Sequence, residues 1–174
     1  MADLNGKNVA IIATNGFEDS ELTSPKEAVE SAGATTKVIS TETGEIEGKK
    51  GAKVAVDAKT ADASADEFDA LILPGGTINA DTIRTDADAV ALVKAFKDAG
   101  KPIGVICHGG WILAEADVLK GVTLTSVANV KTDLANAGAN WVDEEVVVDS
   151  GFISSRTPDD LPAFNATLVE EFAK

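Results

Sequence analysis

The hydrophobic positions fall into short, nearly continuous apolar runs that alternate with longer segments of helical periodicity. The apolar runs lie at residues 8–14, 35–41, 68–76 and 102–106. Runs this short, with no regular polar alternation, are typical of strands that are buried on both faces of a parallel sheet. The pattern therefore predicts a central sheet built from strands that are separated in the sequence by helices.

The intervening segments have apolar positions spaced as on one face of a helix. Predicted helices run from Asp19 or Ser20 to Ser31, over 86–100, over 110–121, around 130–138, and from Asp159 or Asp160 to the C-terminus. Glycine-bounded runs predict a small hairpin within 45–58 and another with its turn at Asp149-Ser150-Gly151. No linker rich in Pro or Ser interrupts the order, which predicts one domain over 1–174 with a three-layer α/β/α fold and a mostly parallel sheet.

In such sheets the reactive groups lie beyond the carboxyl ends of the strands. Three sequence segments follow strand ends here: "ATNGFED" at 13–19, "LPGGT" at 73–77 and "ICHGG" at 106–110. We expect these three segments to meet at one edge of the sheet.

The third segment contains the only cysteine of the chain, Cys107, directly followed by the only histidine, His108. A strand that turns abruptly into a helix exposes the residue at the turn, as in a nucleophile elbow, and flanking glycines such as Gly109 let the turn close. The helix N-terminus should lower the pKa of the Cys107 thiol and favour the nucleophilic thiolate. The alternative is that Cys107 is only a small buried apolar residue.

Other candidate residues surround this elbow. His108 is either a general acid or base or a structural hydrogen-bonding group. Glu18 is either part of the site or an acid that complements the dipole of a helix. Gly75, Gly76 and Gly109 are candidate backbone groups for stabilising an oxyanion, and a plain tight turn is the alternative for the Pro-Gly-Gly segment.

Composition narrows the function classes. The 174 residues carry 15 Lys and Arg against 29 Asp and Glu, a formal net charge of -14, which argues against nucleic acid and anionic membranes as partners. One cysteine forms no intrachain disulfide, and the N-terminus lacks a secretory pattern, so we expect a cytoplasmic protein. One Cys and one His fall short of a zinc set, and "PGGTINAD" is no dinucleotide fingerprint, so neither metal nor cofactor is expected.

Taken together, "GFED", "LPGG", the strand–"CHG"–helix segment and the C-terminal "SRTPDDLPAF" resemble the PfpI/ThiJ superfamily, in its PfpI-like intracellular protease and general-stress branch. The resemblance implies a flavodoxin-like domain, related to class I glutamine amidotransferases, with Cys107 as the elbow nucleophile. It implies that Glu18, as a protonated acid, hydrogen-bonds the sulfur. It also implies that an acid of a neighbouring subunit, best matched by Asp81, orients His108, and that the protein is a homodimer or homohexamer.

Two positions depart from the pattern of the superfamily. The family usually has proline after Cys-His-Gly, whereas this chain has Gly110 followed by the bulky Trp111. Val127 stands where many relatives have an aromatic hydroxyl, and the chain contains no tyrosine. These departures predict a looser elbow, a narrower mouth and different substrate handling.

The resemblance implies a cysteine-dependent hydrolase or lyase that acts on reactive carbonyls, glycated adducts or peptides. The alternative is a redox sensor or stress protein that works through oxidation of Cys107 without turnover. A third possibility is a non-catalytic binding or chaperone-like role, although no exposed apolar stripe in the sequence favours it. The expected partner is therefore a small carbonyl compound or a peptide.

Overall fold

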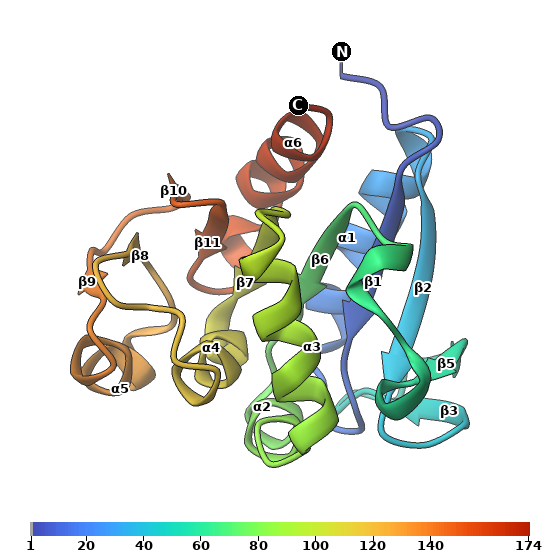
Figure 1. Cartoon of the computed structure of the whole chain (residues 1–174), viewed down its shortest axis with the longest axis horizontal. Helices are drawn as coiled ribbons and strands as arrows, with labels where there is room; N and C mark the ends of the chain where they lie inside the picture. The colour runs from blue at the N-terminus through green and yellow to red at the C-terminus, as the bar shows by residue number, and fades with distance from the viewer. Residues whose placement is uncertain (1) are drawn as a thin grey trace.

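The computed structural model describes residues 2–174, which form a sheet of seven strands in the order β10-β11-β7-β6-β1-β2-β5 (Figure 1). These strands are β1 (Asn8–Ile12), β2 (Thr35–Ser40), β5 (Ala58–Lys59), β6 (Ala70–Leu73), β7 (Ile103–Ile106), β10 (Val147–Asp149) and β11 (Phe152–Ser155). All neighbouring strands pair in parallel except β10 and β11. The predicted mostly parallel sheet is confirmed.

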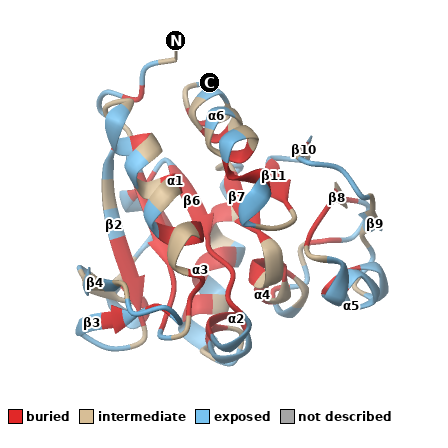
Figure 2. Ribbon diagram, turned by 180° about the vertical axis from the view of Figure 1, so that it is seen from behind, coloured by how far each residue is buried: buried red, intermediate tan, exposed pale blue. Residues whose placement is uncertain are grey.

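Helices cover both faces of this sheet. They are α1 (Asp19–Ser31), α2 (Thr77–Ile83), α3 (Ala87–Asp98), α4 (Trp111–Glu115), α5 (Lys131–Asn136) and α6 (Leu161–Phe172). On β1, Val9 and Ile11 pack in the apolar cluster formed with α1 and α6, whereas Ala10 and Ile12 pack in the cluster formed with α3 and α4. The central strands β1, β6, β7 and β11 are buried almost throughout, and the outer helix faces are exposed (Figure 2). Both faces are thus apolar, as the unbroken strand pattern predicts, and the fold is a flavodoxin-like sandwich.

Two smaller pairs of strands lie outside the main sheet. The antiparallel hairpin of β3 (Gly44–Glu47) and β4 (Lys53–Val56) lies within the predicted segment 45–58 except that it begins one residue earlier, and β8 (Thr123–Leu124) pairs with β9 (Asn140–Trp141). In Figure 1, strands β1 and β2 point toward the end of the molecule where β3 and α2 lie. The β3–β4 hairpin is therefore near the carboxyl edge of the sheet, where the site residues are expected.

Two helices differ from the sequence prediction. The predicted helix over 110–121 is the five-residue α4, preceded by a 3-10 turn over Cys107–Gly110 and followed by Asp117 in a left-handed conformation at φ 56°. Helix α2 has only seven residues, too few for apolar periodicity to mark it in the sequence. Within residues 2–174, no helix combines the length and apolar character that crossing a bilayer requires.

Candidate active site

Cys107 lies at a sharp, strained turn at the end of β7. Its φ of 61° places a non-glycine residue in the left-handed region, which costs conformational energy and is typical of functional turns. The buried β7 fixes the chain before the turn, and the N–H of Val127 donates to the carbonyl oxygen of Cys107 at 3.4 Å. The side chain is half-buried. The elbow predicted from "ICHGG" is therefore present.

The three strand-end segments meet at this elbow, as predicted. The Glu18 N–H donates to the carbonyl oxygen of Gly75 at 3.2 Å, which joins the segments after β1 and β6. The buried amide of Asn79 accepts the Thr14 N–H at 2.7 Å and donates to the Gly75 carbonyl at 2.9 Å. A Cβ atom on Gly75 would collide with Cys107 and with the carboxylate of residue 21, so only glycine lets the segments approach this closely.

The acid beside the thiol is Glu21, which corrects the expectation for Glu18. Glu21 is fully buried, its Oε1 accepts the Gly75 N–H at 3.0 Å, and its carboxyl group lies beside Cys107, since a Cβ atom on Gly75 would collide with both residues. The other oxygen of Glu21, Oε2, is buried without a hydrogen-bond partner among the described residues. A buried carboxyl group with one free oxygen is suited to interact with the sulfur or with an atom bound to it.

Glu18 instead pairs with two lysines at the tip of the β3–β4 hairpin. Its Oε2 lies 2.5 Å from Lys49 Nζ, and its Oε1 lies 3.1 Å from Lys50 Nζ. Burial of Glu18 opposes ionisation, but hydrogen bonds and charge from Lys49 and Lys50 outweigh it and hold its pKa below the usual value. Glu18 is therefore ionised at neutral pH and is not the protonated acid that the resemblance implies.

Cys107 and Glu21 titrate as a coupled pair. Burial, helped by the negative charge of Glu18, raises the pKa of Glu21 to about 7. Burial and the charge of an ionised Glu21 raise the pKa of Cys107 to about 12, although the N–H groups of His108 and Gly76 directed at the sulfur oppose this. Beside an ionised Glu21 the thiol is therefore not acidic, which corrects the expectation drawn from the helix N-terminus alone, and a thiol that ionises near pH 7 requires Glu21 to keep its proton.

The backbone donors decide where the single negative charge of the pair resides. The pair loses its first proton near pH 7 and its second near pH 12, and these values belong to the two groups together. The N–H groups of His108 and Gly76 favour a thiolate, to which a protonated Glu21 can donate, whereas a Glu21 carboxylate accepts one N–H and is repelled by ionised Glu18. We therefore expect the first charge on the sulfur, with Glu21 as the hydrogen-bond donor.

This assignment predicts how the alkylation of Cys107 responds to Glu21→Leu and Glu21→Gln. The wild-type rate should rise with a midpoint near pH 7, the first ionisation of the pair. Leu cannot donate, so its midpoint should rise by about one unit or more, while Gln retains an N–H donor and should fall between. The measurement is the iodoacetamide rate against pH. A Leu profile shifted to lower pH would place the first charge on Glu21 instead.

His108 lies between the thiol and α2. Its Nδ1 is 3.3 Å from Cys107 Sγ and its Nε2 is 3.4 Å from Thr77 Oγ1. Burial and the positive charge of Lys49 lower the pKa of His108, so the imidazole is neutral at neutral pH and can accept a proton. Asp81 lies exposed on α2, and within residues 2–174 no hydrogen bond joins it to His108. Its role across subunits stays a prediction.

The two departures from the superfamily pattern surround the elbow. Trp111 packs edge-on to the His108 ring at 5.4 Å between centroids and donates from Nε1 to Asp133 at 2.7 Å. The guanidinium carbon of Arg84 lies over the Trp111 ring, 5.3 Å from its centroid. Trp111 is thus fixed on two sides and supports one side of the imidazole. Val127 contributes its backbone N–H to the elbow and no hydroxyl group.

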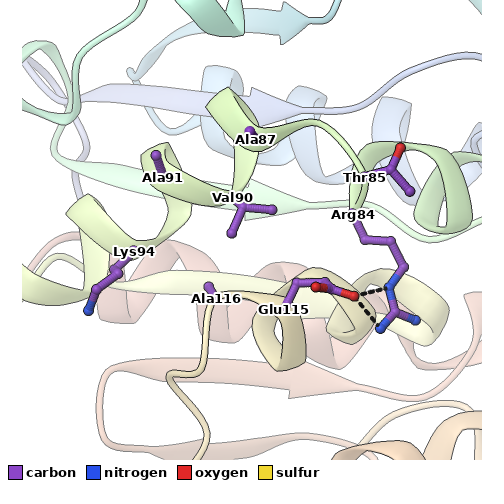
Figure 3. Close-up of a pocket in the computed structure, with 8 residues that line it drawn as sticks. All are labelled: Arg84, Thr85, Ala87, Val90, Ala91, Lys94, Glu115 and Ala116. Atoms are coloured by element: carbon purple, nitrogen blue, oxygen red, sulfur yellow. Dashed lines mark hydrogen bonds and ion pairs between the residues drawn. The ribbon is translucent and has the colours of Figure 1, made fainter.

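A hollow of about 520 Å³ lies between α3 and the end of α4 (Figure 3). Arg84 Nη2 and Glu115 Oε1 pair across its edge at 2.9 Å, and Ala87, Val90, Ala91 and Ala116 supply apolar surface. Its lining includes neither a thiol nor an imidazole. The hollow therefore contains neither Cys107 nor His108 and is separate from the candidate site at the elbow.

Sequence reasoning missed Glu21, Lys49, Thr77, Asn79 and the bracing role of Trp111. A signal existed for Glu21, since it shares the buried face of α1 with Leu22, Pro25 and Val29 at helical spacing. An acid on such an apolar face is exceptional, because burial disfavours a carboxylate. Lys49 had no comparable signal, since its place near the elbow depends on how the β3–β4 hairpin folds back.

The fold and the strained cysteine turn define a flavodoxin-like α/β protein with a nucleophile elbow. A sequence model of the DJ-1/PfpI family matches residues 7–171, and the chain belongs to this family. An uncharacterized protein of Staphylococcus saprophyticus is 52% identical over 168 residues, covering 95% of this chain and 97% of that protein.

Solved structures agree with this assignment. A two-domain protein of Anabaena variabilis, with DJ-1/ThiJ/PfpI-like and ferritin-like domains, matches with a TM-score of 0.92 and 34% identity over 94% of this chain. The match covers 49% of that protein, so the present chain spans about half its length. Drosophila melanogaster DJ-1beta matches with a TM-score of 0.89 and 27% identity, covering 96% of this chain and 90% of its own.

Proposed function

We propose that the protein is a cysteine-dependent hydrolase or lyase that acts on small reactive carbonyl compounds through Cys107. The observation that carries the proposal is the grouping of a strained thiol with a proton-holding acid, Glu21, and a neutral imidazole, His108. The DJ-1/PfpI family includes hydrolases, peptidases and deglycases. Among its substrate classes, small carbonyls suit a half-buried sulfur beside His108 and Trp111 better than peptides or bulky glycated adducts do.

With methylglyoxal as the substrate, the Cys107 thiolate adds to the aldehyde carbon, and Glu21 gives its proton to the resulting alkoxide. His108 then removes the proton on that carbon and returns it to the neighbouring carbonyl carbon, while the hydroxyl proton moves to the neighbouring oxygen, which converts the adduct to a thioester of a 2-hydroxy acid. Water hydrolyses the thioester to a thiolate and lactic acid, with one proton returned to Glu21, and the starting site is restored. These reaction steps consume one water molecule and need no oxidant or cofactor.

A second candidate function is peroxide sensing without turnover. The observation that favours it is the buried, unpartnered Oε2 of Glu21 beside the sulfur. The thiolate would take one oxygen atom from hydrogen peroxide and release hydroxide, so that the sulfur loses two electrons and the peroxide gains them. A protonated Glu21 could then donate a hydrogen bond to the new oxygen.

Two measurements on the same protein separate these functions. Methylglyoxal consumption is compared for untreated protein and protein alkylated with iodoacetamide, which can react with only one thiol in this chain. The intact mass is followed after mild peroxide treatment. Turnover that alkylation abolishes supports the enzyme. Absent turnover with ready addition of oxygen supports the sensor, and turnover that survives alkylation contradicts both.

We also propose that the active unit is a homodimer or homohexamer in which Asp81 of one subunit orients His108 of another. The exposed position of Asp81 on α2 leaves its carboxylate accessible to a second copy of the chain. Sedimentation at micromolar concentration should then show no dominant monomer, and Asp81→Asn should reduce activity about tenfold or more, as expected for loss of a charged orienting group. An active monomer would exclude this role.

A further inference from the structure

The tip of the β3–β4 hairpin brings positive charge to the Cys107 elbow in a strongly acidic chain. The tip is anchored by the Asp19 carboxylate, which accepts the backbone N–H of Lys50 at 2.9 Å and of Ala52 at 2.8 Å. The Lys49 N–H also donates to the carbonyl oxygen of Phe17 at 2.9 Å. These backbone contacts fix residues 49 and 50 beside the segment that carries Glu18.

Lys49 faces the reacting groups as well as Glu18. Its charge acts on Cys107, Glu21 and His108, the three groups assigned to the chemistry. The backbone N–H of Glu18, the partner of Lys49, donates to the carbonyl oxygen of Gly75. Gly75 in turn packs so closely on Cys107 that a Cβ atom on it would collide with the cysteine side chain. The ammonium group is therefore held against the segment that packs on the elbow, where its charge can act on a substrate bound to the sulfur.

The two lysines share a single carboxylate. Glu18 Oε1 pairs with Lys50 and Oε2 pairs with Lys49, and both lysine side chains are more than half exposed. If an incoming anion took Lys49, Glu18 would keep Lys50 and would remain paired. Exchange of one carboxylate for another at Lys49 therefore leaves no buried charge without a partner.

We propose that Lys49 is a specificity-determining residue that binds a carboxylate carried by the carbonyl substrate. The preferred substrate class is then a 2-oxo aldehyde that carries a carboxylate in addition to the two adjacent carbonyl groups used by the proposed reaction, rather than a neutral dicarbonyl. The net charge of -14 makes this local cation important, since the rest of the surface repels anions on average. The inference rests on the proposed function for the role of Cys107 as nucleophile, but its test requires no turnover.

The test compares two alkylating reagents of similar size, anionic iodoacetate and neutral iodoacetamide, on the single thiol. Any effect of Lys49 on the thiolate itself changes both rates, so the ratio of iodoacetate to iodoacetamide rates isolates recognition of the anion. Lys49→Met should lower this ratio roughly three- to tenfold, as expected for one charge near a partly exposed site. Raising the salt concentration should bring the wild-type ratio toward that of the variant.

Matched variants separate Lys49 from general charge effects. Lys50→Met removes an equal charge from the same carboxylate and should lower the ratio less. Glu18→Gln frees Lys49 and should raise the ratio, and adding Lys49→Met to Glu18→Gln should remove the increase. Equal effects of the two lysine variants would overturn the proposal, as would a fall in both rates with an unchanged ratio. Because methylglyoxal turnover is measured separately, failure of the proposed function would not be mistaken for failure of this inference.

Discussion

Cys107→Ser should lower kcat/KM for methylglyoxal by at least about 10⁴-fold, the order of loss seen when an enzyme loses its nucleophile. A serine hydroxyl holds its proton far more tightly than a thiol, so in the pair formed with Glu21 the proton lost near pH 7 would come from the carboxyl group and leave no nucleophilic anion at residue 107. His108 lies 3.3 Å from the sulfur, but its lowered pKa makes it a weak base for activating a hydroxyl group. The measurement is methylglyoxal consumption against enzyme concentration.

The same substitution should leave the fold intact. Serine is close to cysteine in size and accepts the same backbone N–H groups, and the strain at φ 61° is common to both residues. The midpoint of thermal unfolding should therefore shift by only a few degrees. Activity within tenfold of wild type in a folded Cys107→Ser protein would mean that Cys107 is not the nucleophile, and would contradict the proposed function directly.

Much of the fold could be predicted because its signals are local. Unbroken apolar runs such as 8–14 and 102–106 follow from burial on both sheet faces, and the Asp149-Ser150-Gly151 turn follows from residues that tolerate positive φ. The length of α4 could not be predicted in the same way. Its apolar spacing continues past Glu115, but Asp117 takes a left-handed conformation that ends the helix.

The site was predictable in its centre and not in its surroundings. Cys107 and His108 are unique residues at a strand end, so the sequence singles them out. Choosing between Glu18 and Glu21 required knowing where α1 begins. Glu18 precedes the first turn in an extended conformation, and its side chain leaves toward the hairpin, whereas Glu21 is inside the helix on its buried face. Two acids only three residues apart in the sequence therefore have different surroundings: Glu18 is ionised and paired with two exposed lysines, and Glu21 lies beside the thiol.

The pH dependence of stability should carry the signature of Glu21. Its pKa is raised from an ordinary value of 4.5 to about 7, because folding buries it beside Glu18. Between these values the unfolded chain releases the proton while the folded chain keeps it, so the unfolding free energy falls as pH rises. The loss should amount to about 3 kcal/mol by pH 7, from about 1.4 kcal/mol for each unit of raised pKa.

Glu21→Gln should remove this loss, since an amide does not ionise. Groups with lowered pKa, such as Glu18 and Asp160, change stability in the opposite direction in both proteins, so the difference between the two isolates Glu21. Urea unfolding at several pH values between 4.5 and 7 gives that difference, which should grow with pH in favour of Gln. Glu27→Gln, at an exposed position of α1, reports the effect of removing one carboxylate from the helix. A Glu21→Gln difference that stays constant over this range would show that Glu21 releases its proton at its ordinary pKa, and it would then have no proton to give at Cys107.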